Sequence, residues 1–246
     1  MRLAVVSDLH GSLTALDAVA ADVDRRAPDV VLHGGDLALM GPQPAEVVDR
    51  VRELGWAGVV GNTDELLWRP EERERLLGVA PTIADIIRLL FDVYAPPTRE
   101  LLGEERLRYL RSLPAELLVD GVLVVHAIPG DLWRAPMPDA DDDELERTYR
   151  RTDAQTIVYG HIHRPFVRRV GDGLMVTNAG SAGLPWDGDP RASYMLIEHG
   201  EAEVVRVEYD TDRDAALLTS GGHPDAARLA EMRRLGRFIA PGRRTE

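Results

Sequence analysis

Two side chains that bind metals readily stand one residue apart near the start of the chain. Asp8 and His10 follow the apolar run Leu3–Ser7, which is typical of a buried strand. Side chains alternate faces along an extended backbone, so positions i and i+2 point the same way. We therefore expect Asp8 and His10 to converge just past the strand, where Gly11 allows a sharp turn. Such a pair also occurs by chance, so its meaning depends on partners at later strand ends.

Residues of the same chemical types end the later apolar runs of the chain. The full set of candidate ligands is Asp8, His10, Asp36, Asn62, His126, His161 and His163. In open α/β sheets, ligands bind outside the carboxyl ends of the strands, so these side chains can meet. Asp, Asn and His suit borderline first-row metals, and the sequence has no cysteine to offer a soft sulfur ligand.

The number of candidate ligands indicates how many ions they hold. Seven ligands exceed what one ion takes from side chains, whereas two ions that share a carboxylate would fit and leave positions for water and substrate. Two ions about 3.5–4 Å apart clamp the attacking and leaving oxygens of an in-line phosphoryl displacement. The pattern therefore fits a binuclear centre of the kind that supports in-line phosphoryl displacement.

The elements that must position these residues begin with three strand-and-helix units. Strands are expected at Leu3–Ser7, Asp29–His33 and Ala57–Val60. Helices are expected from about Leu13 to a point before Pro28 and at Pro44–Leu54. Units of about 25 to 30 residues indicate a sheet with crossover helices. The next segment, at about residues 65–115, has helical spacing and no convincing strand. We interpret it as a helical insertion broken at Pro96-Pro97, and its role stays open as a lid, a dimer interface or padding.

The second half of the chain returns to strands. A hairpin around Asp120-Gly121 is expected first, because this residue pair is a strong turn signal. A helix at Asp142–Arg151 and a strand at Thr156–Tyr159 follow. Four strands of antiparallel character come next: Phe166–Val170, Leu174–Asn178, Ser193–His199 and Glu203–Tyr209. We predict one domain over residues 1–209, then a peripheral helix and a frayed, arginine-rich tail over residues 210–246.

Composition narrows the function classes. The chain has 246 residues, 44% of them hydrophobic, and a formal net charge of −13, which argues against binding to nucleic acid or an anionic membrane. No apolar run is long enough to span a bilayer, and the first one is too short for a signal peptide, so a cytoplasmic location is expected. The absence of lysine excludes Schiff-base mechanisms.

Five short blocks carry the candidate ligands in a fixed order: Asp8-x-His10, Gly35-Asp36, Gly61-Asn62, His126 and Gly160-His161-x-His163. This order resembles the calcineurin-like metallophosphoesterases over about residues 1–209. The segments Asn178–Pro185 and Asp189–Tyr194 resemble the bacterial, phosphodiesterase-like branch of that family. The resemblance implies a four-layer α/β/β/α sandwich, in which two mixed sheets are flanked by helices.

The resemblance also implies how the ligands divide between two divalent ions: Asp8, His10 and His163 on the first, Asn62, His126 and His161 on the second, and Asp36 bridging both. The attacking group would be a water or hydroxide that bridges the ions, with its pKa lowered by them. Asp36 and Asn62 would then be the residues nearest the reaction. Manganese, iron, zinc and nickel are the usual metals of the family, and the sequence does not choose among them.

One position departs from the common pattern of the family. Many members have a histidine after the asparagine, which contacts phosphate and can protonate the leaving group, whereas this chain has Thr63. Threonine can donate a hydrogen bond to phosphate but is no acid near neutral pH, so the general acid is unassigned. A small residue here also occurs in the phosphodiesterase-like branch. We expect modest activity that favours good leaving groups.

The leading hypothesis is a phosphoesterase acting on small phosphorylated substrates, with diesters preferred to monoesters. The main rival is a scaffold or binding protein that keeps the fold with weak or no activity, like the metallophosphoesterase-like subunit of retromer. A dinucleoside polyphosphate hydrolase is a third hypothesis, but by resemblance it would need the missing histidine. The sequence leaves the oligomeric state open.

Structural roles are the alternative for several residues. Asp8 and Asp36 could cap helices, Asn62 could serve only as a turn residue, and His126 could be a buried, hydrogen-bonded histidine. For His33 a satisfied structural role is favoured over a phosphate contact.

Other polar residues are expected to have ordinary roles. His199 and His223 are expected on the surface, and Asp64 is expected to cap the next helix, with the positioning of a ligand as the minority interpretation. Three loop residues could shape a substrate pocket, although packing or surface roles are favoured for each: Trp133, Arg134 and Trp186.

Overall fold

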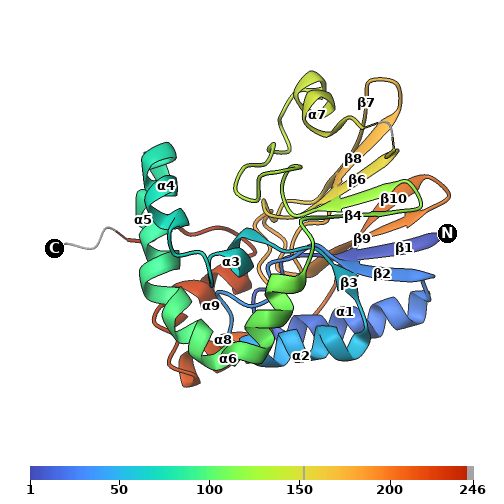
Figure 1. Cartoon of the computed structure of the whole chain (residues 1–246). Coiled ribbons are helices and arrows are strands. Elements are labelled where there is room, and N and C mark those ends of the chain that lie inside the picture. The colour runs from blue at the N-terminus through green and yellow to red at the C-terminus, as the bar shows by residue number, and fades with distance from the viewer. Residues whose placement is uncertain (152, 243–246) are drawn as a thin grey trace.

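Two five-stranded sheets form the centre of the computed structural model, which describes residues 1–151 and 153–242 (Figure 1). The first sheet has the order β10-β9-β1-β2-β3, with strands β1 (Arg2–Val6), β2 (Val30–His33), β3 (Ala57–Gly58), β9 (Ala192–Glu198) and β10 (Glu201–Val207). The second has the order β4-β5-β6-β8-β7, with strands β4 (Glu116–Val119), β5 (Val122–Val125), β6 (Thr156–Tyr159), β7 (Phe166–Val170) and β8 (Leu174–Asn178).

Both sheets mix parallel and antiparallel pairs. In the first, β1 runs parallel to β2, with Leu3 opposite Val30, and antiparallel to β9, with Leu3 opposite Ile197. In the second, β6 is parallel to β5 and β8, while the predicted hairpin joins β4 and β5 and a further antiparallel pair joins β7 and β8. The carboxyl ends of β1, β2, β5 and β6 therefore face one region of the molecule.

The alternation of side chains along β1 explains how the sheets are stacked. Leu3 and Val5 pack against Val122 and Val124 of β5 in a core between the two sheets. Ala4 and Val6 point the other way, into a second core beneath the helices of the first sheet. Because successive side chains of a strand point to opposite faces, the apolar run of β1 contributes to both cores, and both of its faces are buried.

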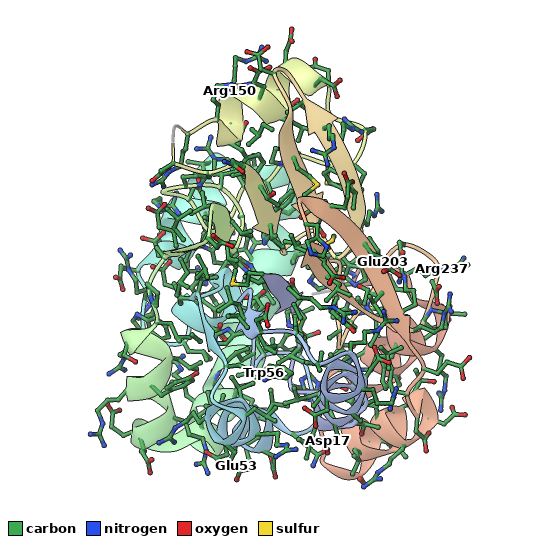
Figure 2. All side chains as sticks on the ribbon, turned by 90° about the vertical axis from the view of Figure 1, so that its right-hand side faces the viewer. Asp17, Glu53, Trp56, Arg150, Glu203 and Arg237 are labelled. Carbon is green, nitrogen blue, oxygen red and sulfur yellow. The ribbon has the colours of Figure 1, made fainter. Side chains whose placement is uncertain are left out.

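Helices cover the outer faces of the two sheets. Helices α1 (Leu13–Arg26) and α2 (Pro44–Leu54) lie under the first sheet, and α7 (Asp142–Tyr149) covers the second. Figure 2 views α1 and α2 nearly end-on, with Asp17 and Glu53 on their solvent side and the buried Trp56 beneath the sheet. This arrangement confirms the predicted four-layer sandwich of two mixed sheets flanked by helices.

The predicted insertion is mainly helical and follows α3 (Asn62–Glu65). It contains α4 (Glu72–Val79), a 3-10 turn η1 (Pro81–Ile83), α5 (Ala84–Arg88), a π-helical stretch η2 (Leu89–Tyr94) and α6 (Ala95–Ser112). The prediction that Pro96-Pro97 breaks the helix is wrong. These prolines lie in the first turn of α6, where no backbone N–H is needed, directly after the wider π-helical turn. The kink lies instead at Gly103, with φ 64°.

The chain after β10 forms two helices, α8 (Thr211–Ser220) and α9 (Ala226–Leu235), where one was expected. They are not peripheral. Arg233 of α9 is fully buried and its Nε donates to Asp214 of α8 at 2.8 Å. The end of the predicted tail, residues 243–246, lies outside the described residues. None of the described helices combines the length and the apolar character needed to cross a bilayer.

Candidate metal centre

All seven candidate ligands come together where the strands end. Asp8 and His10 follow β1, Asp36 follows β2, Asn62 begins the helix after β3, His126 follows β5, and His161 and His163 follow β6. We call these seven residues the ligand cluster. Six of them are buried, and His161 is partly exposed. Strands of both sheets contribute, so the ligand cluster lies at the edge of the sandwich where these strands end.

Two groups within the ligand cluster have atoms close enough to share an ion. In the first, His163 Nε2 lies 3.2 Å from Asp8 Oδ1 and 3.1 Å from His10 Nε2. In the second, His126 Nε2 lies 3.5 Å from Asp36 Oδ2, with Asp8 also in reach. Asp36 Oδ2 is also 3.7 Å from His10 Nε2. This oxygen therefore stands between the two groups, where a bridging carboxylate would be needed.

Hydrogen bonds on the outer side of the rings fix which nitrogen faces inward. His10 Nδ1 donates to the carbonyl of Leu39 at 2.9 Å, and His126 Nδ1 donates to that of Gly34 at 2.8 Å. His163 Nδ1 donates in the same way to Leu184 at 2.5 Å. A neutral imidazole that donates through Nδ1 has a lone pair on Nε2.

The inward nitrogens then face one another as acceptors. His10 Nε2 and His163 Nε2 lie 3.1 Å apart with no proton between them in these tautomers, an arrangement that a cation would stabilise. Asn62 Oδ1 lies 2.8 Å from His126 Nε2 and 3.0 Å from His161 Nδ1. His161 Nε2 donates to the carbonyl of Trp133 at 3.1 Å, so its Nδ1 is also an acceptor. The donor set therefore fits metal ions.

The electrostatics of the two carboxylates lead to the same conclusion. Burial, and then the negative charge of Asp8, raise the pKa of Asp36 to about 8. Burial would also raise the pKa of Asp8, but His163 and the other histidines hold it below its usual value when their rings are protonated. Asp8 and Asp36 have carboxylate oxygens within 4.8 Å of each other, and two buried carboxylates that close cannot both ionise easily unless a cation supplies positive charge.

The backbone brings these ligands together in a way that the strand pattern does not predict. Asp8 and His10 have φ values of 56° and 45°, and His161 and His163 have 66° and 55°. These are left-handed conformations, which are uncommon outside glycine and concentrate at functional sites. The pairs converge as predicted, but the explanation from alternating faces of an extended chain is wrong, because the chain has left the strand before each ligand.

Two glycines are required by the closeness of the turns. A Cβ on Gly61 would overlap the carboxylate of Asp36, and a Cβ on Gly160 would overlap Asp8 and the hydroxyl of Ser7. The glycine in front of Asn62 and the one in front of His161 therefore let the backbone pass against a ligand side chain.

Asp64 holds the loop of Asp36, which was the minority interpretation. Its carboxylate accepts hydrogen bonds from the backbone N–H groups of Asp36 at 2.8 Å, Leu37 at 3.0 Å and Gly61 at 3.2 Å. The last of these also caps α3, so the predicted capping role is present as well. Asp64 is fully buried, and burial followed by the charge of Asp36 raises its pKa to about 7.

Thr63 lies at the departure from the family pattern. Its backbone N–H donates to Asp36 Oδ1 at 2.9 Å, which orients that carboxylate. Its hydroxyl is buried and has no hydrogen-bond partner among residues 1–151 and 153–242.

A cavity of about 370 Å³ opens beside the ligand cluster, and Thr63 lines it together with Trp133 and Trp186. Both tryptophans therefore shape the pocket, against the favoured interpretation, whereas Arg134 is exposed and pairs with Asp131.

The remaining histidines differ from expectation in two cases. His199 is on the surface as predicted. His223 is only partly exposed, because its ring packs on Tyr94 with ring centroids 5.1 Å apart. His33 is buried as expected but not satisfied, since neither ring nitrogen has a partner in the described part of the chain, and burial lowers its pKa to about 4.

Comparisons with known proteins agree with this geometry. A family model described as the calcineurin-like phosphoesterase superfamily domain matches residues 1–202. An uncharacterised protein of Methanocaldococcus jannaschii, MJ0912, is 30% identical over 257 residues, covering 96% of this chain and 98% of that protein. Phosphodiesterase YfcE of Escherichia coli K12 is 25% identical over 215 residues, covering 83% and 91%. A metallophosphoesterase from Sphaerobacter thermophilus superposes with a TM-score of 0.76 at 27% identity, covering 96% and 99%.

Proposed function

Because this chain belongs to the calcineurin-like phosphoesterase superfamily, a family of metal-dependent phosphoesterases, we propose that it is a phosphodiesterase using two divalent metal ions. The observation that carries the proposal is the set of inward-facing nitrogen lone pairs around Asp8 and Asp36. Each ring is fixed from behind by a main-chain carbonyl, so the lone pairs are preorganised for cations. The preference for diesters is supported by the relative YfcE, which is named a phosphodiesterase.

The proposed ligands are Asp8, His10 and His163 for one ion, Asn62, His126 and His161 for the other, and Asp36 between them. When bound, two such ions supply positive charge to the phosphate oxygens and lower the pKa of the attacking water. The nitrogen and oxygen donors favour borderline ions such as Mn, Fe, Zn or Ni.

The side chains of the chain itself orient these groups and the substrate. Thr63 N–H holds Asp36 Oδ1, which leaves Oδ2 directed at His10 and His126. The unpartnered Thr63 hydroxyl lines the cavity and is suited to donate a hydrogen bond to a phosphate oxygen. Since threonine cannot protonate the leaving oxygen, the reaction should favour leaving groups that are stable as anions, such as phenolates.

The proposal is tested by stripping the protein of metal, adding Mn, Ni, Zn or Mg singly, and comparing bis(p-nitrophenyl) phosphate with p-nitrophenyl phosphate. We expect turnover that depends on added metal and is faster for the diester. Asp36→Ala should abolish it, whereas the matched surface variant Asp17→Ala should not, because Asp17 is exposed on α1.

Absence of turnover with every metal, in wild type and Asp36→Ala alike, would favour the rival hypothesis of a scaffold. A faster reaction with the monoester would overturn the proposed preference for diesters, but the protein would still be a metal-dependent phosphoesterase.

A further inference from the structure

The cavity beside the ligand cluster is bounded on its far side by hydrocarbon. Ile83, Ile86 and Leu90 come from the insertion, and Met232 and Phe238 come from α9 and the chain after it. We call these five residues the apolar wall. Figure 1 shows the insertion helices and the two C-terminal helices gathered on the same side of the sheets. Binding of metal and phosphate needs no apolar surface, so the apolar wall calls for another explanation.

The insertion turns one face toward the cavity. Ile83, Ile86 and Leu90 follow helical spacing, whereas Asp85 and Arg88 pair with each other in solvent at 3.1 Å. Two residues of the apolar wall stay open to water, with 42% of Ile83 and 38% of Phe238 exposed. Part of this face is the π-helical stretch Leu89–Tyr94, a conformation that is rare and often found at functional sites.

Hydrogen bonds join the two sides of the apolar wall. Tyr94 of the insertion donates its hydroxyl proton to Asp225 at the start of α9. Arg228 donates to the Tyr94 oxygen at 2.6 Å and to the carbonyl of Ile239 at 2.7 Å. The walls of the cavity are thus connected without a ligand, as is usual for small-molecule sites, and a volume of about 370 Å³ is within their range.

We propose that the substrate is a phosphate diester with an uncharged hydrocarbon substituent, which packs on the apolar wall while its phosphate lies on the ligand cluster. This inference rests on the proposed function. Arg164, which follows His163 and lines the same cavity, adds positive charge suited to the anionic phosphate. The helical insertion is, in this proposal, the specificity element of the enzyme.

A series of p-nitrophenyl alkyl phosphates tests the inference, because the leaving group stays constant while the substituent grows from methyl to butyl to octyl. Burial of a methylene favours binding by about three- to fourfold. We expect kcat/KM to rise at least about tenfold from methyl to butyl, chiefly through a lower KM, since this contact is the same before and during reaction. The p-nitrophenyl ester of thymidine 5′-phosphate serves as the polar comparison.

Two variants locate the effect. Ile83→Ser and Phe238→Ala should reduce the gain from methyl to butyl, measured as a ratio within each variant, to less than about threefold. Val79→Ser and Leu101→Ser are matched controls, because these side chains are 67% and 60% exposed in the same insertion but do not line the cavity. Both controls should keep the wild-type gain.

Binding without turnover gives an independent readout. Octylphosphonate should quench or shift the fluorescence of Trp133 and Trp186 at concentrations at least about tenfold lower than methylphosphonate. Equal binding of the two, or a flat alkyl series with normal turnover of the methyl ester, would overturn the hydrocarbon assignment and leave the proposed function intact. Preference for the thymidine ester over the octyl ester would overturn it in favour of a nucleoside substituent. Tight octylphosphonate binding without hydrolysis of any ester would overturn the proposed function instead.

Discussion

The ligand cluster and the apolar wall face each other across one cavity, yet they are built differently. The ligand cluster sits in tight turns, with left-handed residues such as Asp8 and His163 and with ring nitrogens bonded to main-chain carbonyls. The apolar wall consists of side chains on helical segments of the insertion, on α9 and on the chain after it, two of them still exposed to water. In the proposed enzyme, chemistry would therefore depend on backbone geometry that tolerates little change, whereas substrate preference would depend on side chains that can be exchanged individually.

The strongest test of this contrast is a single methyl group placed against the ligand cluster. Gly61→Ala puts a Cβ onto the carboxylate of Asp36, so the loop must shift. We expect kcat to fall by about 100-fold, as for other misplacements near 1 Å. Gly78→Ala is the control, because its Cβ would meet nothing within 4 Å and it lies inside helix α4. Equal kinetics of the two variants would show that the turn is less constrained than we argue.

The second-largest effect is expected at Asp64, whose carboxylate holds the loop of the proposed ligand Asp36. Asp64→Asn replaces a carboxylate oxygen by an amide nitrogen, so a buried backbone N–H of Asp36 or Leu37 loses its acceptor. We expect a loss of about 2 kcal/mol in the free energy of unfolding and about tenfold or more in metal affinity. Urea unfolding and metal titration measure the two effects. The exposed variant Asp212→Asn should change neither, and a wild-type metal affinity in Asp64→Asn would contradict a positioning role.

A third prediction concerns His33, which, unlike the histidines of the ligand cluster, has no main-chain partner in the described part of the chain. Burial lowers the pKa of His33 to about 4 from 6.5, so below pH 6.5 the unfolded chain binds a proton that the folded chain does not. The free energy of unfolding should therefore decrease as the pH is lowered from about 6.5 to 4. From pH 8 to pH 5 this group accounts for about 2 kcal/mol.

Urea unfolding at both pH values checks this, with His33→Leu losing that part of the acid sensitivity. The surface variant His199→Leu should keep it. An unchanged pH dependence in His33→Leu would mean that His33 finds a partner in solution.

The smallest effect is expected at the apolar wall. Ile86→Ala should leave stability within about 1 kcal/mol, because the side chain is only partly buried and bounds the cavity on one side. The KM for bis(p-nitrophenyl) phosphate should rise about threefold with kcat unchanged. A drop in kcat comparable to that of Gly61→Ala would remove the distinction between the two sides of the cavity.

Much of the fold could be predicted because local patterns determine it. The bounds of β6, β7, β8 and α2 agree with the sequence interpretation, since apolar runs bounded by Gly, Asp and Pro mark them. The gathering of the seven candidate ligands was likewise predictable from residue types at strand ends. Their roles as metal ligands remain a prediction.

What could not be predicted depends on contacts between distant parts of the chain. Asp64 reaches the Asp36 loop across 28 residues, and nothing near Asp64 in sequence distinguishes that role from a helix cap. The packing of His223 on Tyr94 and the burial of Arg233 have the same origin. The left-handed turns at Asp8 and His10 lacked a signal because neither residue is glycine. Only the neighbouring glycines indicated that the backbone turns sharply there.

The buried side chain of Arg233 affects when, during synthesis of the chain, the turn of His10 becomes supported. Its guanidinium donates to the carbonyls of His10 at 3.1 Å and Met40 at 3.0 Å, which lie 223 and 193 residues earlier in the chain. The turn that is synthesised first therefore receives this support only when α9 has left the ribosome. A nascent chain can already contain every candidate ligand while its first ligand turn is still unsupported. If the proposed ligands bind metal, tight capture should accordingly be a late, post-translational event, supported by a residue that lies outside residues 1–202 matched by the family model.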